Sequence, residues 1–313
     1  MSGQRGSVRK DGEGVASRAR LLRVGVSVLR RLPRGCDRLL WSAGGFLSYC
    51  TAGQQRSIVR ENQRLALRAR PGSEGISRWR LEWSTCRAYY FYARYWVEIL
   101  RLGSLAIPEV VMRVDAVDAE QFVARRLARQ PTIVVLAHTG NWEWGGAWAS
   151  ITCNGVTAVA ESLGDPMMTQ WFLETRRRLG IKIILTGGDV ARSLLRSLRD
   201  GELVALLADR DISGRGEVVK FLGENIALAS GPGVLSVMSG APIFPVGTYQ
   251  RRGGRHEVRF FPPIEPPTQG TRAERVAQVM RQVAAAVETI VVAEPHQWHN
   301  FQRYDESPDR GTP

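Results

Sequence analysis

The chain has 313 residues, of which 44% are hydrophobic, enough for one large α/β domain with an appended segment or for two small domains. Its formal net charge of +13 is spread unevenly. Residues 1–101 hold 20 basic residues (Arg and Lys) and 7 acidic ones (Asp and Glu), whereas residues 102–313 hold 23 basic and 23 acidic residues. The N-terminal third therefore predicts an anionic partner, either lipid head groups or nucleic acid.

Several protein classes are disfavoured by motifs that the sequence lacks. The four cysteines show no C-x2-C spacing, so neither a zinc site nor a redox pair is expected, and they are typical of free thiols in a reducing compartment. We expect no metal and no cofactor. G-x-S-x-G, G-x4-G-K-[ST] and H-E-x-x-H are missing, which disfavours serine hydrolases, P-loop enzymes and zincins. We find no secretory signal and no run long enough to cross a bilayer, so a lipid-active protein of this sequence would lie on the membrane.

The N-terminal third is predicted to be helical. Residues 1–15 are rich in Gly, Ser and charge, which indicates disorder. The pattern of residues 16–32 predicts a basic amphipathic helix, which fits an interfacial membrane anchor and equally fits an ordinary surface helix. An apolar stretch, 39–50, is followed by a helix with a basic stripe over 54–70 and by an aromatic-rich helix over 76–102.

Strands alternate with helices through most of the rest of the chain, which predicts an α/β fold with a mostly parallel central sheet flanked by helices. We expect Pro108 to open a helix that continues, in two pieces, to Arg129. The expected strands are 132–137, 156–160, 181–185, 203–208, 242–249 and 256–261, and the expected helices are 142–148, 165–179, 189–199, 233–240 and 272–293. The predicted organisation is a disordered basic tail (1–15), a helical membrane-associating segment (16–102), an α/β domain (103–305) and a frayed tail (306–313).

His138 follows the apolar, β-branched run of the first long strand, and a short turn then leads to Glu143. A carboxylate near an imidazole can fix one tautomer and stabilise the protonated ring, which equips the pair as a general base for an alcohol. A histidine that follows a buried strand more often packs in the protein interior than acts in catalysis. His138, however, lies at the carboxyl end of its strand, where open α/β sheets bind their ligands, and this position favours a catalytic role.

The segment HTGNWE, residues 138–143, resembles the H-x4-D/E motif of membrane-associated glycerolipid and lipid A acyltransferases. Further blocks narrow the resemblance to the phosphatidylinositol mannoside acyltransferases of actinobacteria, and it extends from about Tyr92 to Trp298. These blocks are YARYWVEILRL (Tyr92–Leu102), VALLADRDISGRGEVVKFLGE (Val204–Glu224), GPGVLSVMSGAPIFPV (Gly231–Val246) and EPHQWH (Glu294–His299). The resemblance implies a glycerolipid-acyltransferase-like fold and acyl transfer from acyl-CoA, as donor substrate, to a hydroxyl of a membrane glycolipid.

The resemblance also implies roles for individual residues. His138 looks like the base that takes the proton of the acceptor hydroxyl, and Glu143 fills the acidic position of the motif. Asp209 looks like the carboxylate that pairs with the histidine, at a position where the family more typically has Glu. Either Glu143 or Asp209 could be the main partner of His138. Glu161 and Arg176 match positions near the acceptor sugar, although a polar strand end and a cation at a helix C-terminus would look the same.

Donors for a developing oxyanion are expected in two places. Ser230 and Gly231 begin a predicted helix whose free N–H groups could face an anion. The turn after His138 could also supply N–H groups.

We therefore predict an acyl-CoA-dependent O-acyltransferase, peripheral on the cytoplasmic face of the cell membrane, that modifies a phosphatidylinositol mannoside. Its expected partners are anionic membrane lipids, acyl-CoA and a glycolipid acceptor, with no nucleic acid. One alternative is the same chemistry on a lipid A precursor. A second is a non-enzymatic basic protein that binds membranes or nucleic acid, although no helix-turn-helix, RNP-like or finger motif supports nucleic-acid binding.

Overall fold

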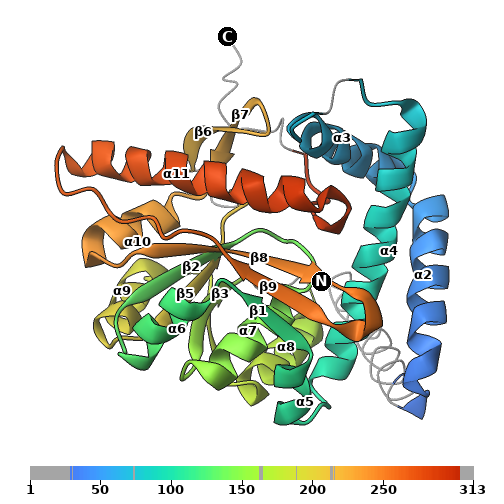
Figure 1. Ribbon diagram of the computed structural model, residues 1–313, viewed down its shortest axis with the longest axis horizontal. Helices are drawn as coiled ribbons and strands as arrows, with labels where there is room; N and C mark the ends of the chain where they lie inside the picture. Colours follow the sequence, from blue (N-terminus) through green and yellow to red (C-terminus); the bar gives the residue numbers. More distant parts are fainter. Residues whose placement is uncertain are drawn as a thin grey trace, which may run out of the picture.

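A seven-stranded, mostly parallel sheet forms the centre of the molecule (Figure 1). The computed structural model describes residues 29, 31–72, 75–161, 165–187, 189–211, 214 and 216–303. The strand order is β1-β9-β8-β2-β5-β3-β4, and only the β8–β9 pair is antiparallel. The predicted α/β fold with a mostly parallel sheet is confirmed. The strands of this sheet are β1 (Val114–Val117), β2 (Thr132–Leu136), β3 (Val156–Ala160), β4 (Ile181–Leu185), β5 (Leu203–Leu207), β8 (Ile243–Gln250) and β9 (His256–Phe260).

Helices cover both faces of the sheet, so its central strands are apolar on both sides. In β2 every residue is buried: Ile133 and Val135 belong to one core, and Val134 and Leu136 belong to the other. One face is covered by α9 (Val190–Arg199), α10 (Gly231–Ser239) and α11 (Arg272–Ala293). The other is covered by α5 (Ile107–Met112), α6 (Glu120–Leu127) and α7 (Trp142–Thr152), with α8 (Pro166–Arg178) packed against β4.

The helix α11 corrects the expectation that no segment is long enough to cross a bilayer. Its 22 residues have the length and composition of a membrane span. It begins with a capping box between Thr271 and Glu274, and its apolar face, from Val276 to Val291, is buried in the core above the sheet. Its hydrophobicity is therefore accounted for by packing inside the molecule.

Three helices from the N-terminal third stand against one end of this body (Figure 1). They are α2 (Asp37–Thr51), α3 (Gln54–Arg68) and α4 (Arg78–Leu102), preceded by the short helix η1 (Arg34–Cys36). Arg101 of α4 donates from Nε to Oδ1 of Asp37 at 2.9 Å, which fixes α2 against α4. The buried Glu98 accepts hydrogen bonds from Arg94, Asn141 and Gln250, so α4 is joined to the sheet through a polar network.

Two features were not predicted from the sequence. The segment expected to be helix between Pro108 and Arg129 contains the edge strand β1, whose four residues pair only with β9. A hairpin of β6 (Glu217–Phe221) and β7 (Glu224–Leu228) packs against α11. Most of the expected helix over 16–32, together with both expected disordered tails, lies outside the described residues.

Candidate active site

His138 and Asp209 meet at the carboxyl edge of the sheet because their strands are neighbours. In the β2–β5 pair, Leu136 is in register with Leu207, and each polar residue lies two positions further along its strand. The imidazole Nδ1 lies 2.7 Å from Oδ1 of Asp209. The Asp209 side chain is 1% exposed and that of His138 is 12% exposed. The pair therefore places a buried carboxylate behind a ring that remains accessible.

The imidazole, a main-chain N–H and an indole N–H of described residues all reach Asp209. Besides the imidazole, its Oδ2 accepts from the main-chain N–H of His138 at 3.1 Å and from the indole N–H of Trp298 at 2.8 Å. Burial alone would raise the pKa of this carboxyl. The charge and hydrogen bond of the His138 ring and the other two donors outweigh that effect and lower the pKa of Asp209 to about 2. Asp209 is consequently ionised at neutral pH.

The ionised carboxylate determines which nitrogen of His138 carries the proton. A carboxylate can only accept hydrogen bonds, so Nδ1 must be the protonated nitrogen of the neutral ring. Nε2 then has a free lone pair, and no described residue donates a hydrogen bond to it. The ring of Trp142 packs edge-on against the imidazole at a centroid distance of 5.1 Å. Nε2 is thus the atom available as a base.

The turn after His138 is fixed by segments that are far away in the sequence. Gly140 has a φ of +56°, and a Cβ there would overlap the main-chain oxygen of Thr248, so glycine is required. The N–H of Gly140 donates to the carbonyl of Gln297, and the N–H of Thr139 donates to the carbonyl of Ala137. These two N–H groups are already used and are not available as oxyanion donors.

Glu143 pairs with Arg176 rather than with His138. Glu143 lies in the first turn of α7 and is buried, and its Oε2 accepts from Nε of Arg176 at 3.0 Å while Oε1 accepts from Nη2. Burial lowers the pKa of the Arg176 guanidinium, but the charge and hydrogen bonds of Glu143 outweigh burial and raise it. Of the two candidate partners of the histidine, the structure therefore brings only Asp209 to it.

An apolar pocket extends between α7 and the sheet, next to this ion pair. It encloses about 770 Å³ of empty space, its open mouth included. Its wall contains Ala158 of β3, Ala205 of β5 and two glycines of α7, Gly145 and Gly146, whose small size leaves room. Trp142, which touches His138, together with Glu143 and Arg176, also lines it. The pocket thus combines an apolar interior with a charged pair and a wall residue, Trp142, that packs against the imidazole.

The other predicted residues are not drawn into this cluster. Glu161 directly follows β3 and is partly exposed. Ser230 precedes α10 without a side-chain cap hydrogen bond, and Gly231 is exposed. Neither Ser230 nor Gly231 lines the apolar pocket. Among the described residues, no group of three His, Cys, Asp or Glu side chains could hold a metal ion.

Comparison with known proteins identifies the family of the chain. The family model described as bacterial lipid A biosynthesis acyltransferase matches residues 20–304. The chain belongs to this acyltransferase family. A phosphatidylinositol mannoside acyltransferase of Mycolicibacterium smegmatis is 29% identical over 214 residues, 67% of this chain and 68% of the relative. Two proteins of the same name from strains of Mycobacterium tuberculosis are 30% identical over 223 residues, 69% of this chain and 68% of each relative. Family membership makes the chain an acyltransferase.

Trp298 is the site residue that sequence reasoning missed. It is 1% exposed, and its indole N–H reaches Asp209 although 89 positions separate the two residues. The block EPHQWH contains it and supplied part of the family resemblance, but no local pattern connects a tryptophan near the C-terminus with a carboxylate at a strand end. In the fold, this block packs against the turn after His138, where Gln297 accepts the N–H of Gly140.

Proposed function

We propose that this acyltransferase transfers a long acyl chain from acyl-CoA to a hydroxyl of a phosphatidylinositol mannoside, with His138 as general base. The observation that carries the proposal is the His138–Asp209 pair next to Trp142, a residue that packs against the imidazole and also lines an apolar pocket. The names of the mycobacterial relatives support the acceptor. Glu143 and Arg176, at the same pocket, are polar groups suited to hold a sugar hydroxyl near the reacting carbonyl.

The proposed reaction needs no covalent enzyme intermediate. Nε2 of His138 takes the proton of the acceptor hydroxyl while that oxygen attacks the thioester carbonyl carbon. The new C–O ester bond forms and the C–S bond breaks, and the departing thiolate takes the proton from the imidazolium. Asp209 stabilises the imidazolium during the step. The main-chain N–H groups of Trp142 and Glu143, at the start of α7, are the candidates to bind the oxyanion, because those of Thr139, Gly140 and Trp144 are used.

A membrane surface is the proposed place of action, on its cytoplasmic face. One side of α2 exposes Leu39, Phe46 and Leu47, each more than 60% accessible. Such a patch on a basic helical segment suits contact with anionic lipid head groups and the acyl chains beneath them. The pocket then accepts the acyl chain of the donor while the glycolipid stays in the bilayer.

Replacing His138 by alanine tests the proposal. Acyl transfer from labelled palmitoyl-CoA to a purified phosphatidylinositol mannoside is expected to fall to background, because the base is lost, while thermal unfolding stays close to that of the wild type. A parallel reaction with a lipid A precursor separates the two acceptors. Undiminished transfer by His138→Ala rules out the role of the base, and transfer to the lipid A precursor alone rules out the proposed acceptor.

A further inference from the structure

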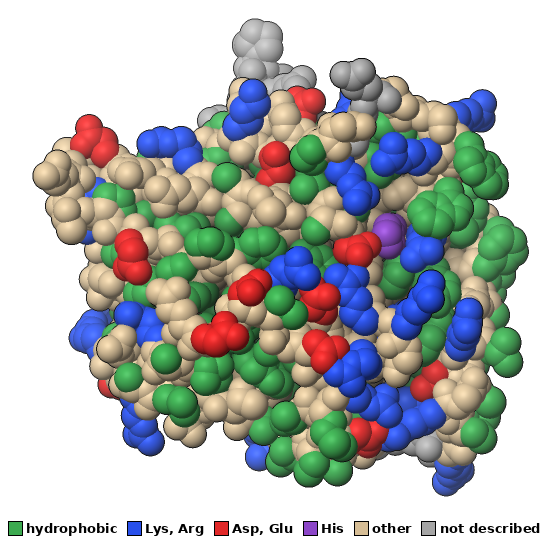
Figure 2. Space-filling model, in the orientation of Figure 1, with side chains coloured by type: hydrophobic (Ala, Val, Ile, Leu, Met, Phe, Trp, Pro, Cys, Tyr) green, Lys and Arg blue, Asp and Glu red, His purple; other side chains and the backbone are tan. Residues whose placement is uncertain are grey.

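A second cavity lies between α2, α4 and the β8–β9 turn. We call it the basic groove and define it by Arg38 and Trp41 of α2, by Arg87, Tyr90, Phe91 and Arg94 of α4, and by Arg251 and Arg252 of the β8–β9 turn. It holds about 1700 Å³ of empty space, its open mouth included. Figure 2 shows basic side chains gathered on this half of the molecule.

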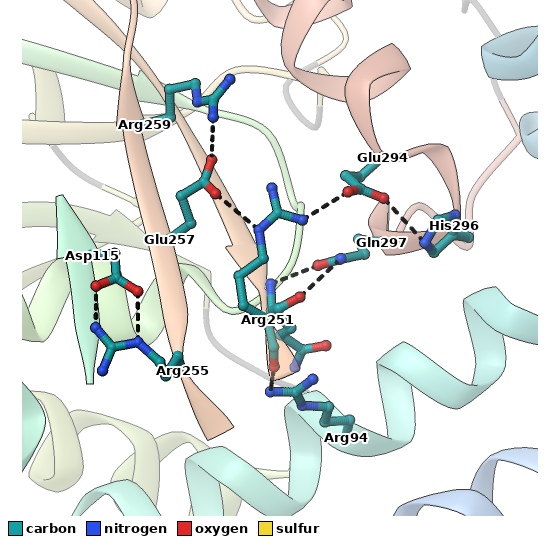
Figure 3. A network of polar contacts seen from close by, with 10 residues as sticks. Arg94, Asp115, Arg251, Arg255, Glu257, Arg259, Glu294, His296 and Gln297 are labelled. Atoms are coloured by element: carbon teal, nitrogen blue, oxygen red, sulfur yellow. Dashed lines mark hydrogen bonds and ion pairs between the residues drawn. The ribbon is translucent and has the colours of Figure 1, made fainter. Parts of the chain in front are cut away.

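The groove has more positive charge than its carboxylates neutralise. Five arginines line it, and Glu294 is the carboxylate among its lining residues. Glu294 already accepts from Arg251 at 2.7 Å and lies 3.2 Å from Nε2 of His296, as Figure 3 shows. Within the described part of the chain, Arg38, Arg87 and Arg252 have no carboxylate partner. Cations collected in a concave site without counter-charges favour an anionic ligand.

Two of the guanidinium groups are held in position before any ligand arrives. Arg87 lies over the rings of Trp83 and Phe91, at 4.6 and 5.0 Å, and its buried Nε has no acceptor. Arg94 is 6% exposed, lies 5.3 Å from the Trp41 ring and donates from Nη2 to the main-chain oxygen of Arg251. A site with fixed donors loses little conformational entropy on binding.

The walls of the groove are also fixed. The indole N–H of Trp41 donates to the hydroxyl of Tyr90 at 2.8 Å, which joins α2 to α4 inside the groove. A Cβ at Gly45 would come within 2.7 Å of the Cα of Tyr90, so the two helices are in close contact there. Burial, and after it the charges of Arg87, Arg70 and Arg251, lower the pKa of the adjacent His296 to about 3. The His296 ring is therefore neutral at neutral pH, and the positive charge of the groove comes from its arginines.

We propose that the basic groove binds a phosphate ester, supplied either by an anionic membrane phospholipid or by a soluble molecule. Arginine forks match phosphate oxygens in pairs, and the aromatic wall accommodates the organic part of the ester. The exposed Leu39 lies directly after Arg38 on α2, so a lipid phosphate can enter the groove while its chains remain in the bilayer. The site is separate from the acyl-transfer chemistry and does not depend on the role of His138.

The soluble source is tested by thiol protection. Cys86 lines the groove and is partly exposed, whereas Cys50 is exposed on α2 and does not line it. Glycerophosphoinositol or inorganic phosphate is expected to slow alkylation of Cys86 by N-ethylmaleimide relative to Cys50 in the full chain. Calorimetric titration with the same two compounds gives their affinities.

The lipid source is tested by co-sedimentation with phosphatidylinositol vesicles and with phosphatidylcholine vesicles. The groove variant is Arg87→Gln/Arg252→Gln. Its matched control, Arg196→Gln/Arg199→Gln, removes the same charge from exposed positions of α9, outside the groove. A third pair, Arg38→Gln/Arg252→Gln, changes only exposed side chains and covers the case in which the loss of Arg87 unfolds the protein.

The groove variants are expected to bind at least about tenfold more weakly than the control, because each loses charge-assisted hydrogen bonds to phosphate. A loss confined to phosphatidylinositol vesicles identifies a lipid phosphate, and a loss of calorimetric affinity and of Cys86 protection identifies a soluble ester. Both outcomes support the site. Equal binding by the groove variants and the control, in both assays and with unchanged thermal unfolding, overturns the proposal.

Discussion

Replacing Asp209 by asparagine tests the dyad through the tautomer of His138. Two donors, the indole of Trp298 and the main-chain N–H of His138, converge on Oδ2, whereas the imidazole faces Oδ1. The single oxygen of an amide is therefore expected to take the Oδ2 position. Its NH₂ group then points at Nδ1 and forces that nitrogen to accept, which moves the ring proton to Nε2. The base is blocked although the geometry is retained.

The expected loss is large because two effects add. The imidazolium loses a charge-assisted hydrogen bond of about 1.5–3 kcal/mol, and the active tautomer becomes the minor one. Since 1.4 kcal/mol corresponds to a tenfold change in rate, kcat is expected to fall by at least about 100-fold. Transfer of labelled palmitoyl groups measures it, with Asp200→Asn, an exposed site at the end of α9, as the control.

Adding Trp298→Phe to Asp209→Asn tests the expected orientation of the amide. In Asp209→Asn/Trp298→Phe one of the two donors at Oδ2 is gone, so the two amide orientations become similar in energy. The double variant should therefore recover part of the kcat lost by Asp209→Asn, even though it carries one more change in a buried site. An Asp209→Asn enzyme within a few-fold of wild type, or a double variant that is slower than the single one at equal folding, contradicts the assignment.

Three further predictions concern the pocket and pH. Glu143→Gln leaves the partly buried Arg176 without its charge partner and should lower the free energy of unfolding in urea by about 3 kcal/mol. Partial recovery is expected in Glu143→Gln/Arg176→Met, and an unchanged urea midpoint contradicts this prediction. Ala158→Phe fills the pocket and should shift donor preference towards shorter acyl-CoA by about 0.8 kcal/mol per excluded methylene. Ala285→Phe, on the exposed side of α11, is the control and should leave the preference unchanged. An unaltered chain-length profile in Ala158→Phe refutes the pocket's role. Burial holds the pKa values of three histidines well below about 6.5, so the unfolded chain binds more protons and stability falls as pH drops below about 6.5, by up to about 1.4 kcal/mol per pH unit for each. Urea melts between neutral pH and about pH 4.5 measure this loss, and a flat profile contradicts it. These histidines are His256, with a pKa of about 4, and His296 and His299, each with a pKa of about 3.

The sequence by itself determined the elements that local pattern controls. Runs of buried β-branched residues and helical spacing predicted most of the strands and helices, from β2 to α11, within a few residues of their observed ends. This works because periodicity reports which side of an element is buried. The sequence pattern also placed His138 and Asp209 at the ends of strands, because a strand end is a local feature. The edge strand β1 was missed because four residues carry too little pattern and its state depends on pairing with β9.

Only the tertiary structure decided which side chains meet. Glu143 is five positions from His138, yet the start of α7 directs it to Arg176, while the β2–β5 register brings Asp209 across 71 positions. The charge count assigned the anion-binding surface to the first 101 residues, but the basic groove also needs the arginines of the β8–β9 turn. Side-chain encounters depend on register and helix packing, which join distant segments and leave no periodic trace in the sequence.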